Sequence, residues 1–249
     1  MTPDQRALDR DHSVLRYILD RYAAERPTAP FVDFWPSLEW DYRTTRERVR
    51  RRAATLQSHG VKRGDHVLCF MGNGEDLLVT WFAINYIGAV YVPINTAALG
   101  RPLEHILDDA DAPVMVARAN LVQRLQDVAP GKLRKVLVVE GTTNCQVTGV
   151  KVLPLIDVEV VQETDLVLDK PIEPWDTLAI MYTSGTTGNA KGVITSYVQL
   201  YTMGPDAFDC VDETDRCLIC GPIFHCGSTL YVYAMLARGL SIGMMREFK

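Results

Sequence analysis

Hydrophobic positions along the chain follow two spacings that alternate from one end to the other. In some segments apolar residues recur three and four positions apart, which is typical of amphipathic helices, and elsewhere they form short continuous runs, which are typical of buried strands. The predicted helices cover residues 14–24, 44–60, 75–86, 102–109, 119–128, 197–207 and 228–237. The predicted strands cover residues 31–34, 38–40, 66–70, 89–93, 113–117, 135–139, 176–182, 216–220 and 241–245. Strands alternating with helices predict an α/β fold with mostly parallel sheets flanked by helices.

This alternation breaks down between residues 140 and 173. The stretch contains strand-like fragments but no helical period, so we predict an irregular connector and a candidate subdivision near residues 140–172. The sequence contains no internal repeat and no low-complexity tract. We therefore expect the chain to fold as one α/β unit.

The composition is that of a globular protein. Of the 249 residues, 47% are hydrophobic and 23% are charged, which suffices for a sizeable core and excludes disordered and fibrous classes. The formal net charge of −5 argues against a protein that binds nucleic acid through its overall charge. A dense basic run lies within the predicted helix 44–60: Arg46, Arg48, Arg50, Arg51 and Arg52. We interpret this run as a solvated helix face, with a polyanion site as the alternative.

The cysteine pattern does not resemble a disulfide framework. The six residues are Cys69, Cys145, Cys210, Cys217, Cys220 and Cys226. The charged N-terminus lacks the apolar core of a secretory signal, so a reducing, cytoplasmic location is expected, and no stretch is apolar enough for a membrane span. Cys217 and Cys220 have CxxC spacing, but His225 and Cys226 follow too closely to complete a standard zinc site. Buried strand thiols are expected instead.

The residues best suited to binding a ligand lie in segment 182–193, YTSGTTGNAKGV, at the end of the predicted apolar strand 176–182. Its glycines let the backbone turn N–H groups toward one point, its hydroxyls add neutral donors, and Lys191 adds a positive charge. The GxxxxGK[ST] motif fails because Ala190 precedes the lysine and Gly192 follows it, and the GxGxxG fingerprint fails as well. The segment predicts a phosphate-binding loop of another kind, with a flexible polar turn as the alternative.

The loop closely resembles the signature segment YTSGTTGxPKGV of the AMP-forming adenylate enzymes, which include acyl-CoA synthetases, luciferases and peptide-synthetase adenylation domains. Three further segments are similar to that family in order and spacing: residues 61–67, 88–95 and 221–225. Two positions depart from it. Ala190 stands where the family usually has proline, and Tyr197 stands where many members have histidine.

The resemblance implies a role for individual residues. The loop that would hold the ATP phosphates and the departing pyrophosphate consists of Thr183, Ser184, Gly185, Thr186, Thr187, Gly188 and Lys191. Thr186 matches a hydroxyl that contacts Mg²⁺, and Lys191 and His225 match catalytic positions. His225 corresponds to a residue at the mouth of the acyl pocket, and a satisfied core histidine is the alternative for this side chain.

The resemblance further implies that residues 1–249 are the N-terminal part of an AMP-binding domain, namely the N-terminal portion of the large domain of an acyl-CoA synthetase. We expect the C-terminal half and the small C-terminal domain to be absent, and the chain alone to be inactive. The implied parent is a carboxylate–CoA ligase that uses ATP, Mg²⁺, coenzyme A and a carboxylic acid. A carrier-loading or luciferase-like enzyme and a non-catalytic nucleotide-binding module are the alternatives. No nucleic-acid partner is expected, and a homo-oligomer is a candidate assembly.

Overall fold

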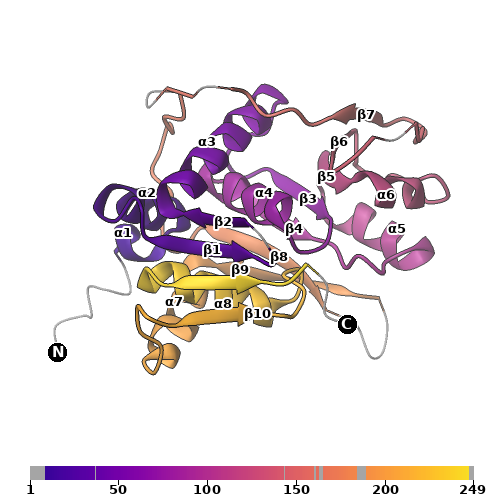
Figure 1. Ribbon diagram of the computed structural model, residues 1–249. Coiled ribbons are helices and arrows are strands. Elements are labelled where there is room, and N and C mark those ends of the chain that lie inside the picture. Colours follow the sequence, from indigo (N-terminus) through magenta and orange to yellow (C-terminus); the bar gives the residue numbers. More distant parts are fainter. Residues whose placement is uncertain are drawn as a thin grey trace.

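The computed structural model describes residues 9–36, 38–142, 144–159, 161–162, 165–183 and 189–246. It contains two sheets with helices packed around them (Figure 1). The helices are α1 (Arg10–Ser13), α2 (Leu15–Glu25), α3 (Tyr42–Ser58), α4 (Glu75–Tyr86), α5 (Gly100–Asp109), α6 (Ala119–Val122), α7 (Tyr197–Met203) and α8 (Cys226–Arg238), with 3-10 turns η2 (Gln123–Leu125) and η3 (Pro205–Phe208). The strands are β1 (Pro30–Phe34), β2 (Leu38–Asp41), β3 (His66–Phe70), β4 (Val90–Pro93), β5 (Val114–Arg118), β6 (Lys135–Val139), β7 (Lys151–Pro154), β8 (Thr177–Thr183), β9 (Lys191–Ser196), β10 (Arg216–Ile219) and β11 (Ser241–Met244).

The larger sheet has seven strands in the order β7-β6-β5-β3-β4-β8-β9. All neighbours pair in parallel except β8 and β9, which form an antiparallel hairpin at one edge. The smaller sheet has the order β10-β11-β1-β2, and only β1 and β2 are antiparallel within it. The predicted α/β fold with mostly parallel sheets flanked by helices is confirmed.

Helix α4 fills the space between the two sheets. Its twelve residues are apolar on nearly every side, and those from Leu77 to Tyr86 are all buried. Trp81 stacks on Tyr91 of the larger sheet with 5.4 Å between ring centroids, and Phe82 lies 6.0 Å from Phe31 of the smaller sheet. A helix that is hydrophobic all round is stable only when it is covered on all sides. α4 therefore joins both sheets into one core.

Most predicted elements are present, and several details differ. The helix predicted to open at Thr44 begins at Tyr42, because the side chain of Asp41 accepts a hydrogen bond from the Thr44 N–H at 2.7 Å and caps the helix. The helix predicted at 119–128 ends at Val122 and continues as the turn η2. The predicted connector contains strand β7, which pairs with β6. Strand β9 was not predicted, because its short run directly follows the glycine-rich loop.

The basic run on α3 is not a uniformly solvated face. Arg52 is buried, and its guanidinium contacts Thr80 at 2.6 Å, Asp76 at 2.7 Å and Asp157 at 2.6 Å. Arg50 is buried as well and donates to the Gln162 carbonyl at 2.7 Å. Our interpretation is therefore wrong for these two arginines, which hold the connector between β7 and β8 against α3.

Strand β10 lies at the edge of its sheet, which changes the environment of two cysteines. Cys217 on β10 is half-buried, and Cys220 just after it is exposed. The expectation of buried strand thiols is wrong for Cys220, because this residue lies one position beyond the end of β10 and is exposed. Among the residues that the structure describes, no helix is both long and apolar enough to cross a bilayer.

Candidate functional site

A cleft of about 470 Å³ opens where strands of both sheets end. It is lined by Gly72, Asn73, Thr96, Arg118, Asn120, Leu121, Arg124, Cys220, Pro222, Phe224 and Arg246. Many of these residues lie at or just beyond the carboxyl ends of β3, β4, β5, β10 and β11. Parallel α/β sheets bind ligands beyond the carboxyl ends of their strands, so this cleft is the candidate site of the described chain.

Asn73 connects the two sheets beneath the cleft. Its side chain donates to the carbonyls of Gly221 at 2.9 Å and Met245 at 3.2 Å, and its oxygen accepts from the Ile223 N–H at 2.9 Å. The residue is buried at 5% exposure. If its side chain were removed, each partner would therefore lose a hydrogen bond that water cannot easily replace. The role of Asn73 could not be predicted from the sequence, because its partners lie about 150 to 170 positions away.

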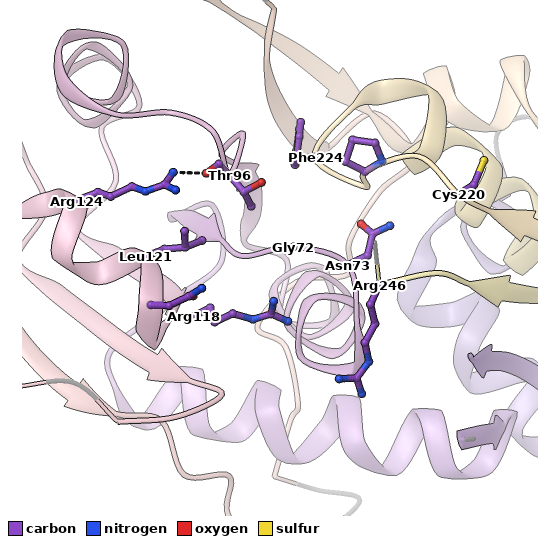
Figure 2. A pocket seen from close by; sticks show the side chains of 11 residues that line it. Gly72, Asn73, Thr96, Arg118, Leu121, Arg124, Cys220, Phe224 and Arg246 are labelled. Carbon is purple, nitrogen blue, oxygen red and sulfur yellow. Dashed lines mark hydrogen bonds between the residues drawn. The ribbon is translucent and has the colours of Figure 1, made fainter. Parts of the chain in front are cut away.

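Three arginines reach the cleft from different elements, as Figure 2 shows. Arg118 pairs with Glu140 at 2.5 Å, and its buried Nε has no partner in the described part of the chain. Arg124 donates to the carbonyls of Thr96 and Ala98, and Arg246 pairs with Glu75. Two of the three guanidinium groups are thus paired with a carboxylate, whereas Arg124 contacts neutral carbonyls. The described lining contains these three arginines and no Asp or Glu, and it therefore favours an anionic ligand.

The predicted phosphate loop connects β8 to β9. Residues 184–188, which include the predicted Mg²⁺ contact Thr186, lie outside the described residues. Thr183 and Lys191 flank them as paired residues of the hairpin, and the Thr183 hydroxyl donates to the Lys191 carbonyl at 3.5 Å. Lys191 is exposed, and no carboxylate among the described residues forms an ion pair with it. The structure thus brings two predicted phosphate-binding residues together and leaves the ammonium group accessible.

His225 precedes α8 as its N-cap, with its Nδ1 accepting a hydrogen bond from the Gly227 N–H at 3.3 Å. The side chain is exposed, so the alternative of a satisfied core histidine is wrong. Its neighbour Phe224 lines the cleft, and Asn73 holds the adjoining Ile223. No described contact joins His225 to Thr183 or Lys191. The structure places His225 beside the cleft rather than against the described ends of the loop.

Tyr197 begins α7 and is buried at 1% exposure. Its hydroxyl donates to the Asn85 carbonyl at 3.5 Å, and burial raises the pKa of this phenol above its usual value, so it stays neutral. At this position, where the family resemblance placed a histidine, the chain therefore has a packing residue. Among the described residues, no group of three or more His, Cys, Asp or Glu side chains could hold a metal ion.

Comparison with known proteins places this geometry in a family. A crotonobetaine/carnitine–CoA ligase of Proteus sp. (strain LE138) is 27% identical over 84% of this chain and 41% of its own length. A 2-succinylbenzoate–CoA ligase of Geobacillus sp. (strain WCH70) is 30% identical over 81% of this chain and 37% of its own length. The chain thus spans less than half the length of these curated relatives.

The fold of a solved structure also matches. The crystal structure of a long-chain-fatty-acid-CoA ligase (FadD1) from Archaeoglobus fulgidus superposes with a TM-score of 0.77, covering 96% of this chain and 48% of that one at 23% identity. At this identity the match shows a shared fold. The model of the family described as AMP-binding enzyme matches residues 19–249, nearly the whole chain. The chain therefore belongs to the AMP-binding enzyme family.

Proposed function

We propose that this chain is the N-terminal part of an AMP-forming carboxylate–CoA ligase. The observation that carries the proposal is the β8–β9 hairpin, which presents Thr183 and an exposed Lys191 without an ion-pair partner among the described residues at the two ends of the glycine-rich loop. The family membership supports the same conclusion, as do the relatives that are named as CoA ligases.

In the proposed reaction a carboxylate attacks the α-phosphorus of ATP and gives an acyl adenylate and pyrophosphate. The thiol of coenzyme A then attacks the acyl carbon and releases AMP. The first step concentrates negative charge on the departing pyrophosphate, which preorganised N–H groups, hydroxyls and a lysine stabilise. The substrates supply both nucleophiles, so the protein has to bind and orient the substrates and to neutralise the charge on the phosphates.

Residues of this chain would divide that work. Lys191 would contact the β- and γ-phosphates, and each charge-assisted contact contributes ~1.5–3 kcal/mol. Ser184, Gly185, Thr186, Thr187 and Gly188 would complete the cradle, and Thr186 would contact Mg²⁺ that arrives with the nucleotide. The cleft with Arg118, Arg124 and Arg246 suits an anionic part of a substrate. His225 would lie at the mouth of the acyl pocket.

We propose the substrate class, a carboxylic acid, and no single acid, because a pocket built from several segments changes its preference with one or two side chains. Since the chain covers less than half of its curated relatives, we expect it to bind phosphate weakly and to complete neither half-reaction alone. An enzyme that loads a carrier thiol instead of coenzyme A shares the first step and is the second candidate.

Pyrophosphate exchange on the full-length protein tests the proposal. A panel of carboxylic acids is screened for acid-dependent exchange of labelled pyrophosphate into ATP, and the active acids are then assayed for CoA-dependent release of AMP. We expect both activities with the same acid. Exchange without a CoA thioester would exclude the CoA ligase and favour the carrier-loading enzyme. Absence of exchange with every acid, together with micromolar ATP binding by residues 1–249, would favour a nucleotide-binding module.

A further inference from the structure

Helix α5 contacts the chain on both sides of the phosphate loop. The Nε2 atom of His105 lies 2.7 Å from the Ala190 carbonyl oxygen, one residue before Lys191. The hydroxyl of Tyr182 donates to Oδ2 of Asp109 at 2.7 Å, one residue before Thr183. His105 and Asp109 are four positions apart and so share one face of the helix. A single helix face therefore holds the chain just before the loop and just after it.

The geometry defines the role of each group. A carbonyl oxygen only accepts, so Nε2 of His105 carries the proton and donates it. Tyr182 pairs with Gly192 across the hairpin, and a Cβ at Gly192 would lie 3.3 Å from the Tyr182 ring and 2.8 Å from the Ile180 side chain. Only glycine fits at this position without displacing its neighbours. The tyrosine ring is thereby fixed between the hairpin and α5.

We propose that His105 is a positioning residue for the phosphate loop, because it fixes the Ala190 carbonyl and with it the direction in which the backbone enters Lys191. This inference rests on the proposed function, since it assigns His105 to the placement of the lysine that contacts the phosphates. His105 itself touches no substrate. Its hydrogen bond fixes the end of the loop before the nucleotide arrives, so that binding loses less conformational freedom there.

A histidine that only stabilised α5 would behave differently, and the chain contains a matched control for that role. Nδ1 of His66 lies 2.7 Å from the carbonyl of Ala110, the residue that caps the C-terminal end of α5. Both histidines are half-buried, and both contact a backbone carbonyl at the same distance. His66 thus anchors the same helix without touching the loop.

The test compares four proteins of the full 249 residues: wild type, H105A, H105Q and H66A. Hydrogen exchange of the amides at 191–193, relative to those at 194–196, measures the order at the end of the loop without any ligand. Titration with inorganic pyrophosphate, followed by calorimetry or NMR, measures the consequence for binding. Glutamine places its Nε2 donor at a position similar to that of the histidine Nε2, so H105Q is the conservative variant.

We expect H105A to raise the exchange rate of the amides at 191–193 by about tenfold. We also expect it to weaken pyrophosphate binding by about tenfold, and each change is equivalent to ~1.4 kcal/mol. H105Q should restore most of both values, and H66A should change neither by more than about twofold. The inference is overturned if H105A matches the wild type, or if H66A reproduces the effects of H105A. If the wild type binds no pyrophosphate, the proposed function fails, and the exchange data still decide whether His105 orders this end of the loop.

Discussion

Replacing Asn73 by alanine tests whether one side chain holds the two sheets together beneath the cleft. The substitution leaves the buried Ile223 N–H without its acceptor, which costs about 1–3 kcal/mol, and removes a donor from each of two carbonyls at about 0.5–1.5 kcal/mol each. The three losses overlap, so we expect a decrease of about 2–5 kcal/mol in the free energy of unfolding. That is a large share of the ~5–15 kcal/mol typical of a folded domain.

Urea denaturation monitored by tryptophan fluorescence measures this change. Asn120→Ala is the matched control, because Asn120 lines the same cleft but is exposed, and its side chain makes no hydrogen bond to a described residue. We expect the control to lie within about 0.5 kcal/mol of the wild type. An Asn73→Ala variant as stable as the Asn120→Ala control would refute the role assigned to Asn73.

Three further predictions concern the corrected features and titration. Arg52→Leu leaves the carboxylates of Asp76 and Asp157 without their buried partner, and it should lower the free energy of unfolding in urea by about 3–5 kcal/mol. The control Arg51→Leu, on the exposed side of the helix, should lower it by less than about 0.5 kcal/mol. Burial lowers the pKa of His59 below its ordinary value of 6.5, so the contribution of His59 to stability should fall as the pH drops below that value. The wild-type urea midpoint should therefore be lower at about pH 5.5 than at about pH 7.5, and His59→Gln should make this difference smaller. In peptide-resolved thiol labelling, exposed Cys220 should react in the native state, and buried Cys69, whose pKa burial raises, should react only after unfolding; equal rates would contradict the packing.

Elements with strong local patterns were predicted from the sequence closely. Helix α4 and strand β3 have the predicted bounds, because a long apolar helix and a continuous apolar strand each fix their own type. The phosphate-binding loop was inferred from its composition and its place after a strand, and it stays a prediction because residues 184–188 lie outside the described residues. Strand β9 could not be recognised in the same way, because its short run gains strand structure from pairing with β8.

Side chains whose partners are distant in sequence were not predictable. The pattern of α3 shows a basic run, but the burial of Arg52 depends on Asp157, which lies 105 positions away. In the sequence nothing distinguishes Asn73 from other polar residues in loops, and only the structure shows that Gly221 and Met245 lie beside it. His105 likewise contacts Ala190 across 85 positions. Local periodicity predicts elements, whereas the site depends on how the sheets bring their ends together.

Titration of residues 1–249 with ATP and with inorganic pyrophosphate, on the wild type and Lys191→Ala, tests the central claim most directly. Lys151→Ala is the control, because Lys151 is also exposed and begins the strand at the opposite edge of the same sheet. We predict wild-type affinity that is roughly millimolar, about 4 kcal/mol, unchanged in Lys151→Ala and lost in Lys191→Ala. Equal affinity of the wild type and Lys191→Ala would contradict the assignment of the phosphate-binding loop.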